Sequence, residues 1–489
     1  MRLLDSLAVC AYTYMYNTAI CLFLYTLLLY FYNIVRLRHI PSPGFPLPIV
    51  GHMYMKHATT VLKFLAICRK KCGGVFSFWA GGHPIVVVMD PIAAKQIFVG
   101  DGKTFMKGTD YTKKFARVFG QGLVTAIGEK HRLDSSIMHR AFNRINVEKY
   151  RYFMREQTTE LMNEILLPND GKEVDVSVFF HVLSLRIFGY FAVGYEYSKD
   201  VETAKWINES VSYGSKVIGE HIFYGLPVHP IIPRIRKMLR QISDVTPHFD
   251  RIISKRIESR RRGEPENSDC LKAMLDSKMQ KKDIYEHLVT LLSAGHDTMS
   301  YFGCYTALLL AKHPKVQRKI KIELKSVLGN RVDVTADDIK KMKYLPAVMK
   351  ESLRLYSVIP FVTRIALKDT ILHGKNGSSF RISKGTNCMI PLSIMSRDEA
   401  VWENPNEFQP ERFLDIATFS SAKLGFLPFG HGKRECIGNI LAQIEGQTIF
   451  ALLLQRVTFE EIPGFKPKID GGISLTTSNG VRVKIRVDE

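Results

Sequence analysis

The sequence predicts a mainly helical protein with a small β domain, preceded by one N-terminal transmembrane helix. Three observations lead to this fold class. The chain opens with a long apolar run, stretches of helical periodicity dominate its middle, and short β-branched or aromatic runs occur near residues 74–88 and 380–390. Hydrophobic residues make up 46% of the 489 positions, which is enough for a large core.

Charge and cysteine content limit the classes of partner. The formal net charge is +21, which favours acidic partners such as an acidic protein face, anionic lipid or nucleic acid. Basic residues are not clustered with aromatic ones and no nucleic-acid motif is present, so we expect no nucleic-acid partner. Eight cysteines without regular spacing do not form the pattern of a disulfide framework.

The first element is an uncharged apolar stretch from Ala8 to Val35. It is long enough to cross a bilayer as a helix. It is too long for a cleaved signal peptide, and no small-residue cleavage site follows it. Arg36 and Arg38 come directly after it, so the positive-inside rule places the bulk of the chain in the cytosol. Residues 1–35 are therefore predicted to be a single-pass membrane anchor.

A basic and proline-rich hinge follows over residues 36–51. Its prolines, from Pro41 to Pro48, exclude a helix and favour a stiff, extended chain. The hinge separates the anchor from one large domain, residues 52–489.

Strand patterns begin just inside this domain. Gly74–Trp79 and Pro84–Val88 are typical of two paired strands, and Asp90 followed by proline predicts a helix through Phe98. Phe380–Ile382 and Thr386–Ile390 supply further strand patterns.

Helices account for most of the remaining chain. A basic helix is predicted from Gly128 to Phe142, and a longer helical region from Val174 to Arg262. The apolar segment Ile222–Pro233 interrupts that region; it is either a buried loop or a loop that enters a membrane interface. Asp283–Leu310 has the near-continuous apolar character of the central helix of a large domain.

That central helix contains the segment Ala294-Gly295-His296-Asp297-Thr298. Small residues at 294 and 295 would let a flat cofactor approach the helix. A threonine hydroxyl in mid-helix bonds either a preceding carbonyl or a ligand. The simpler alternative is that Gly295 is tolerated and Thr298 only packs. We expect His296 to be outward-facing or structural rather than a ligand.

The segment from Phe429 to Gly438 is a loop with one cysteine that leads directly into an apolar helical pattern. A cysteine before a helix is favoured as thiolate by the free N–H groups there, and an arginine could pair with an anionic group of the same ligand. Thiolate, glycine loop and arginine together suit a haem site. The residues of this constellation are Phe429, Gly430, Gly432, Arg434, Cys436 and Gly438.

Three other interpretations apply to this loop. A phosphate-binding loop fails because His431 stands where the lysine is needed and no Ser or Thr follows. A zinc site would need further cysteines or histidines at ligand spacing nearby, and there are none. An ordinary structural cysteine at a helix start remains an alternative.

The loop resembles the haem-binding signature of cytochrome P-450 enzymes, and Ala442 and Glu445 continue the match into the following helix. The resemblance implies the cytochrome P-450 fold of the microsomal, membrane-anchored type. It also implies haem b (iron protoporphyrin IX) with Cys436 as the axial ligand of the iron.

The same resemblance assigns roles elsewhere in the chain. Asp297 and Thr298 match the acid–alcohol pair that delivers protons during dioxygen reduction. Glu351 and Arg354 match an element that, with Arg412, locks the core around the haem. The other implied cofactor contacts are Ala294, Gly295, Arg132 and Arg364, the last at a haem propionate. Two positions depart from the family pattern: His131 replaces the usual tryptophan and Ser135 the usual arginine, both propionate partners.

The resemblance further implies a monooxygenase that inserts one oxygen atom from O2 into a lipophilic small molecule (a sterol, fatty acid or xenobiotic). Its electrons would come from NADPH through a flavoprotein reductase, and its place would be the endoplasmic reticulum membrane, in lipid metabolism. The alternatives are a haem-thiolate isomerase or dehydratase and a non-catalytic haem-binding sensor.

Overall fold

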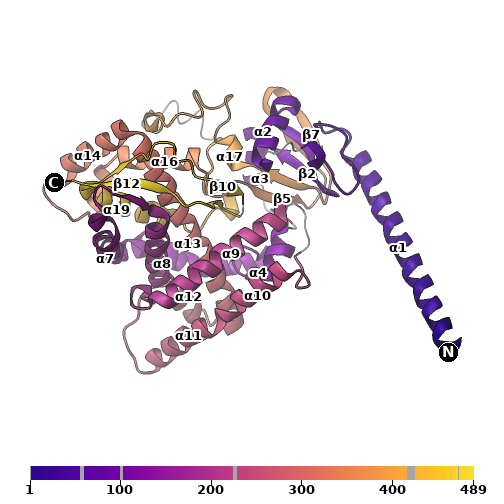
Figure 1. Cartoon of the computed structure of the whole chain (residues 1–489), viewed down its shortest axis with the longest axis horizontal. Helices are drawn as coiled ribbons and strands as arrows, with labels where there is room; N and C mark the ends of the chain where they lie inside the picture. Colours follow the sequence, from indigo (N-terminus) through magenta and orange to yellow (C-terminus); the bar gives the residue numbers. More distant parts are fainter. Residues whose placement is uncertain are drawn as a thin grey trace.

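The computed structural model describes residues 2–55, 60–99, 103–108, 110–223, 228–415, 425–471 and 473–488. Helices form most of the body, and the largest sheet lies next to the N-terminal helix, which projects away from the body (Figure 1). The predicted fold class, mainly helical with small sheets, is confirmed.

Eighteen labelled α-helices are found in the described ranges. They are α1 (Arg2–Leu37), α2 (Val61–Cys72), α3 (Pro91–Val99), α4 (Ala116–Phe119), α5 (Gly128–Phe142), α6 (Arg144–Lys149), α7 (Arg151–Leu161), α8 (Val176–Val193), α9 (Val201–Phe223), α10 (Pro233–Asp244), α11 (Thr246–Arg261), α12 (Cys270–Asp276), α13 (Lys281–Lys312), α14 (Pro314–Leu328), α15 (Ala336–Lys341), α16 (Tyr344–Leu355), α17 (Leu392–Met395) and α19 (Asn439–Arg456).

The strands form one five-stranded sheet, one three-stranded sheet and two pairs, with the orders β1-β2-β8-β5-β3, β4-β12-β9, β6-β7 and β10-β11. Their bounds are β1 (Val75–Ala80), β2 (His83–Val88), β3 (Phe105–Lys107), β4 (Glu173–Asp175), β5 (Val362–Ala366), β6 (Thr370–His373), β7 (Ser379–Ile382), β8 (Asn387–Ile390), β9 (Val457–Glu460), β10 (Ile469–Gly471), β11 (Leu475–Thr477) and β12 (Arg482–Val487).

The five-stranded sheet combines strands from the first half of the chain (β1, β2 and β3) with strands from the second half (β5 and β8). β1 and β2 form the predicted hairpin, and β2 then pairs in parallel with β8, which comes from the second half of the chain. Asp90 caps α3, since its Oδ1 accepts the N–H groups of Ile92 and Ala93 at 2.9 and 3.0 Å. This sheet places β3 and β5 side by side, in antiparallel register.

The predicted central helix is α13, which begins two residues earlier and ends two residues later than the sequence pattern. Its second half is almost wholly buried, and α8 packs along it (Figure 1). α8 is itself mostly buried, so its apolar character belongs to the core, although its length and hydropathy would allow a membrane span.

The N-terminal helix α1 is exposed over most of its length. Its segment Tyr12–Leu37 is long and apolar enough to cross a membrane. The end of the helix contacts the body, because the Tyr30 ring lies edge-on to Trp79 at 5.5 Å and its hydroxyl donates to the carbonyl of Pro46. Helix α1 is therefore joined to the body by side-chain contacts as well as by the residues that follow it.

The apolar segment 222–233 is only partly described. Residues 224–227 and the side chains of 222 and 223 lie outside the described residues. Beyond them Val228 is buried and its carbonyl accepts a hydrogen bond from Arg117, while Ile231 is 73% exposed. The described part of the loop thus presents one apolar side chain to the core and one to the surface.

Candidate active site

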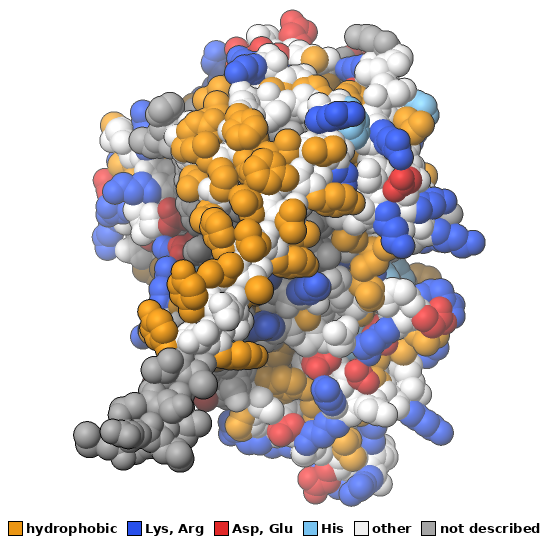
Figure 2. Space-filling model, turned by 90° about the vertical axis from the view of Figure 1, so that its right-hand side faces the viewer, with side chains coloured by type: hydrophobic (Ala, Val, Ile, Leu, Met, Phe, Trp, Pro, Cys, Tyr) orange, Lys and Arg blue, Asp and Glu red, His pale blue; other side chains and the backbone are white. Residues whose placement is uncertain are grey.

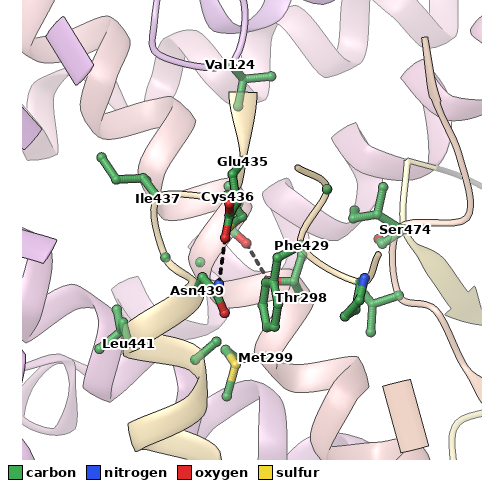
Figure 3. A pocket seen from close by; sticks show the side chains of 18 of the residues that line it. Val124, Thr298, Met299, Phe429, Glu435, Cys436, Ile437, Asn439, Leu441 and Ser474 are labelled. Atoms are coloured by element: carbon green, nitrogen blue, oxygen red, sulfur yellow. Dashed lines mark hydrogen bonds between the residues drawn. The ribbon is translucent and has the colours of Figure 1, made fainter. Parts of the chain in front are cut away.

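A cavity of about 550 Å3 lies between α13 and the cysteine loop. Its walls come from distant parts of the sequence, namely β3, α5, α13, β5, the loop and the C-terminal turn. Figure 3 shows Cys436, Thr298 and Ser474 as lining residues of one pocket. The loop and helix singled out in the sequence therefore face a common space.

The cysteine loop is shaped by its own backbone. The N–H of Cys436 donates to the carbonyl of Phe429 at 2.9 Å, and the N–H of Glu435 donates to the carbonyl of Gly432 at 2.9 Å. The loop then enters α19, whose first residue is Asn439. Cys436 therefore lies just before the N-terminal end of α19 and is accessible from the cavity.

Two effects act on the Cys436 thiol. Its deep position in the protein raises its pKa, and the backbone hydrogen bond from Gly438 lowers it. Burial is the larger effect in the protein alone. The structure thus places the cysteine as predicted, but the helix start does not make it a thiolate by itself. A bound cation, such as a metal ion, would be needed to favour the deprotonated form.

Gly432 differs from the prediction, because it is not among the residues that line the cavity. Its φ is +72°, and a Cβ there would lie 2.3 Å from the carbonyl oxygen of Phe98 at the end of α3. This glycine lets the loop pack against α3. Gly432 therefore has a packing role in this loop, whereas Phe429, Gly430, Arg434 and Gly438 line the cavity.

On the opposite wall, α13 contributes Ala294, Gly295, Asp297 and Thr298. The Thr298 hydroxyl donates to the carbonyl of Ala294 at 2.7 Å. Asp297 is buried and accepts a hydrogen bond from the hydroxyl of Ser474. Burial raises the pKa of the Asp297 carboxyl, and the Ser474 hydrogen bond and nearby His181 oppose that rise. An acid and an alcohol thus lie side by side on the cavity wall.

Gly295 and His296, which precede Asp297 on α13, make packing and hydrogen-bond contacts with α8. A Cβ at Gly295 would lie 2.2 Å from the ring of Phe188, so the close packing of α8 requires a glycine there. His296 is fully buried, not outward-facing, and its Nε2 lies 3.1 Å from the carbonyl oxygen of His181. Burial lowers the pKa of His296 to about 3, which keeps it neutral. The prediction that His296 is structural agrees with this contact.

Three cationic side chains gather on one side of the cavity. Lys107 of β3 and Arg364 of β5 stand directly opposite each other in the antiparallel register, and Arg434 comes from the cysteine loop. Burial, Arg364 and Arg434 all lower the pKa of Lys107, and burial and Arg364 lower that of Arg434 to about 10. Like charges opposite each other in a sheet are destabilising, so this arrangement favours an anion between them.

The orphaned nitrogen Nη1 of Arg434 supports the same conclusion. It is buried and has no hydrogen-bond partner in the described part of the chain. A buried guanidinium nitrogen without a partner costs free energy unless a ligand supplies an acceptor. Sequence analysis missed Lys107, because a lysine in a short strand carries no signal until the sheet places it beside Arg364.

Helix α5 completes this wall with the two departures from the family pattern. His131 and Ser135 both line the cavity, one helical turn apart. Burial, followed by Arg434 and Lys107, lowers the pKa of His131 to about 4, so it is neutral. Arg132 is one residue further round the helix; it is exposed and pairs with Glu129. Arg132 is thus not among the residues that line the cavity, unlike its neighbour His131.

Glu351, Arg354 and Arg412 form a fully buried cluster behind the cavity. Arg354 donates to both carboxylate oxygens of Glu351, at 2.7 and 2.8 Å, and the Nε of Arg412 donates to Oε1 at 3.1 Å. Arg354 also donates to three backbone carbonyls. The structure thus brings Arg412, which is distant in sequence, to the neighbouring pair Glu351 and Arg354 of α16.

Comparison with known proteins decides the family. The sequence model described as cytochrome P450 matches residues 41–484. The chain belongs to the cytochrome P450 family. It is 28% identical to cytochrome P450 734A1 of Arabidopsis thaliana, over 83% of this chain and 79% of the relative. It is 26% identical to cytochrome P450 4V2 of Rattus norvegicus, over 92% of this chain and 90% of the relative.

Membership in the cytochrome P450 family makes haem the cofactor and haem-thiolate monooxygenation the class of activity. The residues present fit haem. A cysteine faces the cavity from one side, small residues of α13 face it from the other, and the three cations with the orphaned Arg434 nitrogen suit the carboxylates of the macrocycle.

Proposed function

We propose that this cytochrome P450 inserts one oxygen atom from O2 into a lipophilic small molecule, with NADPH electrons delivered by a flavoprotein reductase. The observation that carries the proposal is the single cavity bounded by Cys436 on one side and by Asp297 and Thr298 on the other. Haem bound through a cysteine thiolate supplies the activation of dioxygen.

The residues of the cavity would hold the cofactor at two places. Cys436 would ligate the iron, and Lys107, Arg364 and Arg434 would bind the haem carboxylates. Neutral His131 can donate one further hydrogen bond. Charge-assisted hydrogen bonds of this kind are stronger than hydrogen bonds between neutral groups. The three cations Lys107, Arg364 and Arg434, here called the cation wall, would therefore fix the rotation of the macrocycle in its plane.

Asp297 and Thr298 would carry protons into the cavity. Thr298 Oγ1 is bonded to a carbonyl of its own helix and can turn toward a ligand, while Asp297 has an ionisable carboxyl within the same turn. The pair also favours the monooxygenase over an isomerase or dehydratase, since those enzymes need no proton delivery to dioxygen.

Thr298→Ala tests this role. The variant should bind substrate normally but divert reducing equivalents to hydrogen peroxide, because proton delivery is impaired. Thr306→Ala is a matched control on the same helix, outside the residues that line the cavity. Unchanged coupling of NADPH use to product in Thr298→Ala would remove Thr298 from the mechanism.

The walls around this chemistry favour a lipophilic substrate. Aromatic and aliphatic side chains from the segment before α5, from α8, from α13 and from the C-terminal turn line the cavity: Phe115, Phe119, Leu123, Val124, Phe188, Leu291 and Ile473. An apolar cavity with few polar groups is typical of a site for small apolar ligands. Sterols, fatty acids and xenobiotics share this chemistry.

The reductase would meet the outer side of the cysteine loop, where Lys433 is exposed. Basic groups on this face complement an acidic partner and speed its association. NADPH-dependent oxygen uptake in membranes reconstituted with a flavoprotein reductase tests the electron supply. We expect substrate-dependent uptake; a reaction without reductase would indicate an isomerase or dehydratase, and haem binding without either would indicate a sensor.

We place the protein in the endoplasmic reticulum membrane, with residues 1–35 as a single-pass anchor, residues 36–51 as the hinge and residues 52–489 as the cytosolic catalytic domain. The exposed apolar helix and the following arginines support this topology. Figure 2 shows the apolar side chains of α1 in front of the body, whose visible surface carries many basic side chains among fewer acidic ones. Deleting residues 1–28 preserves the Tyr30 contact and should release much of the protein from membranes with its haem retained; loss of folding would contradict a separate anchor.

A further inference from the structure

In the part of the chain that the structure describes, one side chain donates a hydrogen bond to the acid of the proposed acid–alcohol pair. The hydroxyl of Ser474 donates to Oδ2 of Asp297, while Oδ1 is buried and has no partner among the described residues. Ser474 is itself 1% exposed and lies in the C-terminal turn that lines the same cavity. The two residues come from segments that only the fold brings together.

The turn is held against α13 at several points. Asp297, Tyr301 and Tyr305 are spaced four residues apart and so lie along one stripe of the helix. The Tyr305 hydroxyl donates to the carbonyl of Leu475 at 2.8 Å. The N–H of Leu475 also donates to the carbonyl of Val358 at 2.8 Å.

These contacts fix the register of the turn on the helix, so that Ser474 meets Asp297 in a defined geometry. We propose that Ser474 is a positioning residue, whose hydroxyl holds one carboxylate oxygen of Asp297 and leaves the other to transfer protons. This inference rests on the proposed role of Asp297 in proton delivery. Neither the sequence motif nor the family match identifies Ser474.

The hydrogen bond has an electrostatic consequence. Burial favours the neutral form of the Asp297 carboxyl, and donation from Ser474 is the largest opposing effect, ahead of His181. Without the hydroxyl, the carboxyl would stay protonated to higher pH. The other titratable groups with electrostatic contact to Asp297 come from α8 and α13: His181, Tyr301, Cys304 and Tyr305.

The test is an infrared pH titration of the full-length, haem-loaded protein. The carbonyl band of the protonated Asp297 carboxyl is assigned as the one missing in Asp297→Asn. In Ser474→Ala its titration midpoint should move upward by about one to two pH units, as expected for the loss of one hydrogen bond to a charged group. Ser474→Thr keeps the hydroxyl and should restore the wild-type midpoint.

Ser478→Ala is the matched control, because its hydroxyl lies near the same turn and, among the described residues, donates to the carbonyl of Lys468 alone, at 3.5 Å. Its midpoint should equal that of wild type. An unchanged midpoint in Ser474→Ala would overturn the proposal. If that variant does not fold, Ser474→Cys, which has a similar size and a weaker donor, should shift the midpoint in the same direction, and no shift would again overturn it.

The coupling of NADPH use to product formation tests this inference separately from the proposed role of Asp297. In Ser474→Ala a shifted midpoint together with greater hydrogen peroxide release supports both. A shifted midpoint with unchanged coupling would show that Ser474 positions Asp297 but that Asp297 does not deliver the protons. In that case the proposed proton path would be wrong, and the contact between Ser474 and Asp297 would still hold.

Discussion

Two buried clusters of charge in this molecule have opposite character. In the first, Glu351 lies between Arg354 and Arg412, and nearly every donor has a protein acceptor. In the second, Lys107, Arg364 and Arg434 face the cavity together. Arg364 lowers the pKa of both Lys107 and Arg434, and Nη1 of Arg434 is buried without a partner in the described residues.

The difference separates structural charge from ligand-binding charge. A balanced cluster locks secondary-structure elements together and has nothing left to bind. A cluster made of cations alone repels itself, and an anion bound between the cations would relieve that repulsion. The first cluster therefore belongs to the folding of the core and the second to the haem, and the following experiments separate these two roles.

Breaking the balanced cluster should have the largest effect. Arg354→Met removes both bonds to Glu351 and three to backbone carbonyls, and leaves a buried carboxylate partly uncompensated. We expect a loss of about 3–5 kcal/mol in the free energy of unfolding. Denaturant unfolding measures it in protein with the haem extracted. Arg132→Met, which breaks an exposed pair, is the control and should unfold like wild type; equal losses in both would contradict the distinction.

Glu445 is a buried carboxyl without an ionic partner in the described chain, and the effect expected there is of similar size. Both its oxygens lack hydrogen-bond partners in the described chain, and burial raises its pKa from 4.5 to about 8. A raised pKa means that the folded state holds the proton longer, so stability is greatest below about pH 4.5 and falls as pH rises to about 8. The fall should be roughly 4–5 kcal/mol, because each unit of pKa difference corresponds to about 1.4 kcal/mol. Glu445→Gln should remove it, and identical pH profiles of unfolding would contradict the assignment.

For the cation wall we expect one substitution to have opposite effects on the stability of the haem-free protein and on haem retention. Lys107→Met removes a like charge opposite Arg364, so protein without haem should be as stable as wild type or more stable by about 0.5 kcal/mol. The same variant should lose haem faster by about tenfold or more, because one charge-assisted hydrogen bond to a carboxylate is gone. Unfolding of the haem-free protein and haem transfer to an apo-globin measure the two effects. Instability without haem would place Lys107 in the folding core instead.

The smallest effect concerns the departures on α5. Since His131 and Ser135 line the cavity and do not face solvent, His131→Trp with Ser135→Arg should slow haem loss by up to about tenfold, through up to two added hydrogen bonds. The gain is limited because the new arginine joins three cations already present. Equal transfer rates in wild type and double variant would show that Lys107 already compensates for both departures.

The sequence predicted the elements whose signals are local. The Cys436 loop, the α13 segment and the paired strands all have motifs or periodicity that do not depend on the rest of the chain. The buried Glu351 cluster followed from the family resemblance, because in sequence alone Glu351 and Arg354 are an ordinary surface-type pair.

What the sequence missed depends on tertiary register. Arg132 is basic and adjacent to His131, but successive residues on a helix point in different directions, so a helix that turns 131 and 135 inward turns 132 outward. Lys107 gained its role only when β3 paired with β5, and Ser474 only when the C-terminal turn docked on α13. No pattern within these segments encodes those contacts.

The central claim is that this cavity binds haem through the Cys436 thiolate. The most direct measurement is the carbon monoxide difference spectrum of the reduced, membrane-bound protein in wild type, Cys436→Ala and Cys388→Ala, a buried cysteine away from the cavity. Wild type and Cys388→Ala should show the red-shifted Soret band of thiolate ligation, and Cys436→Ala should lack it. Retention of that band in Cys436→Ala would contradict the account.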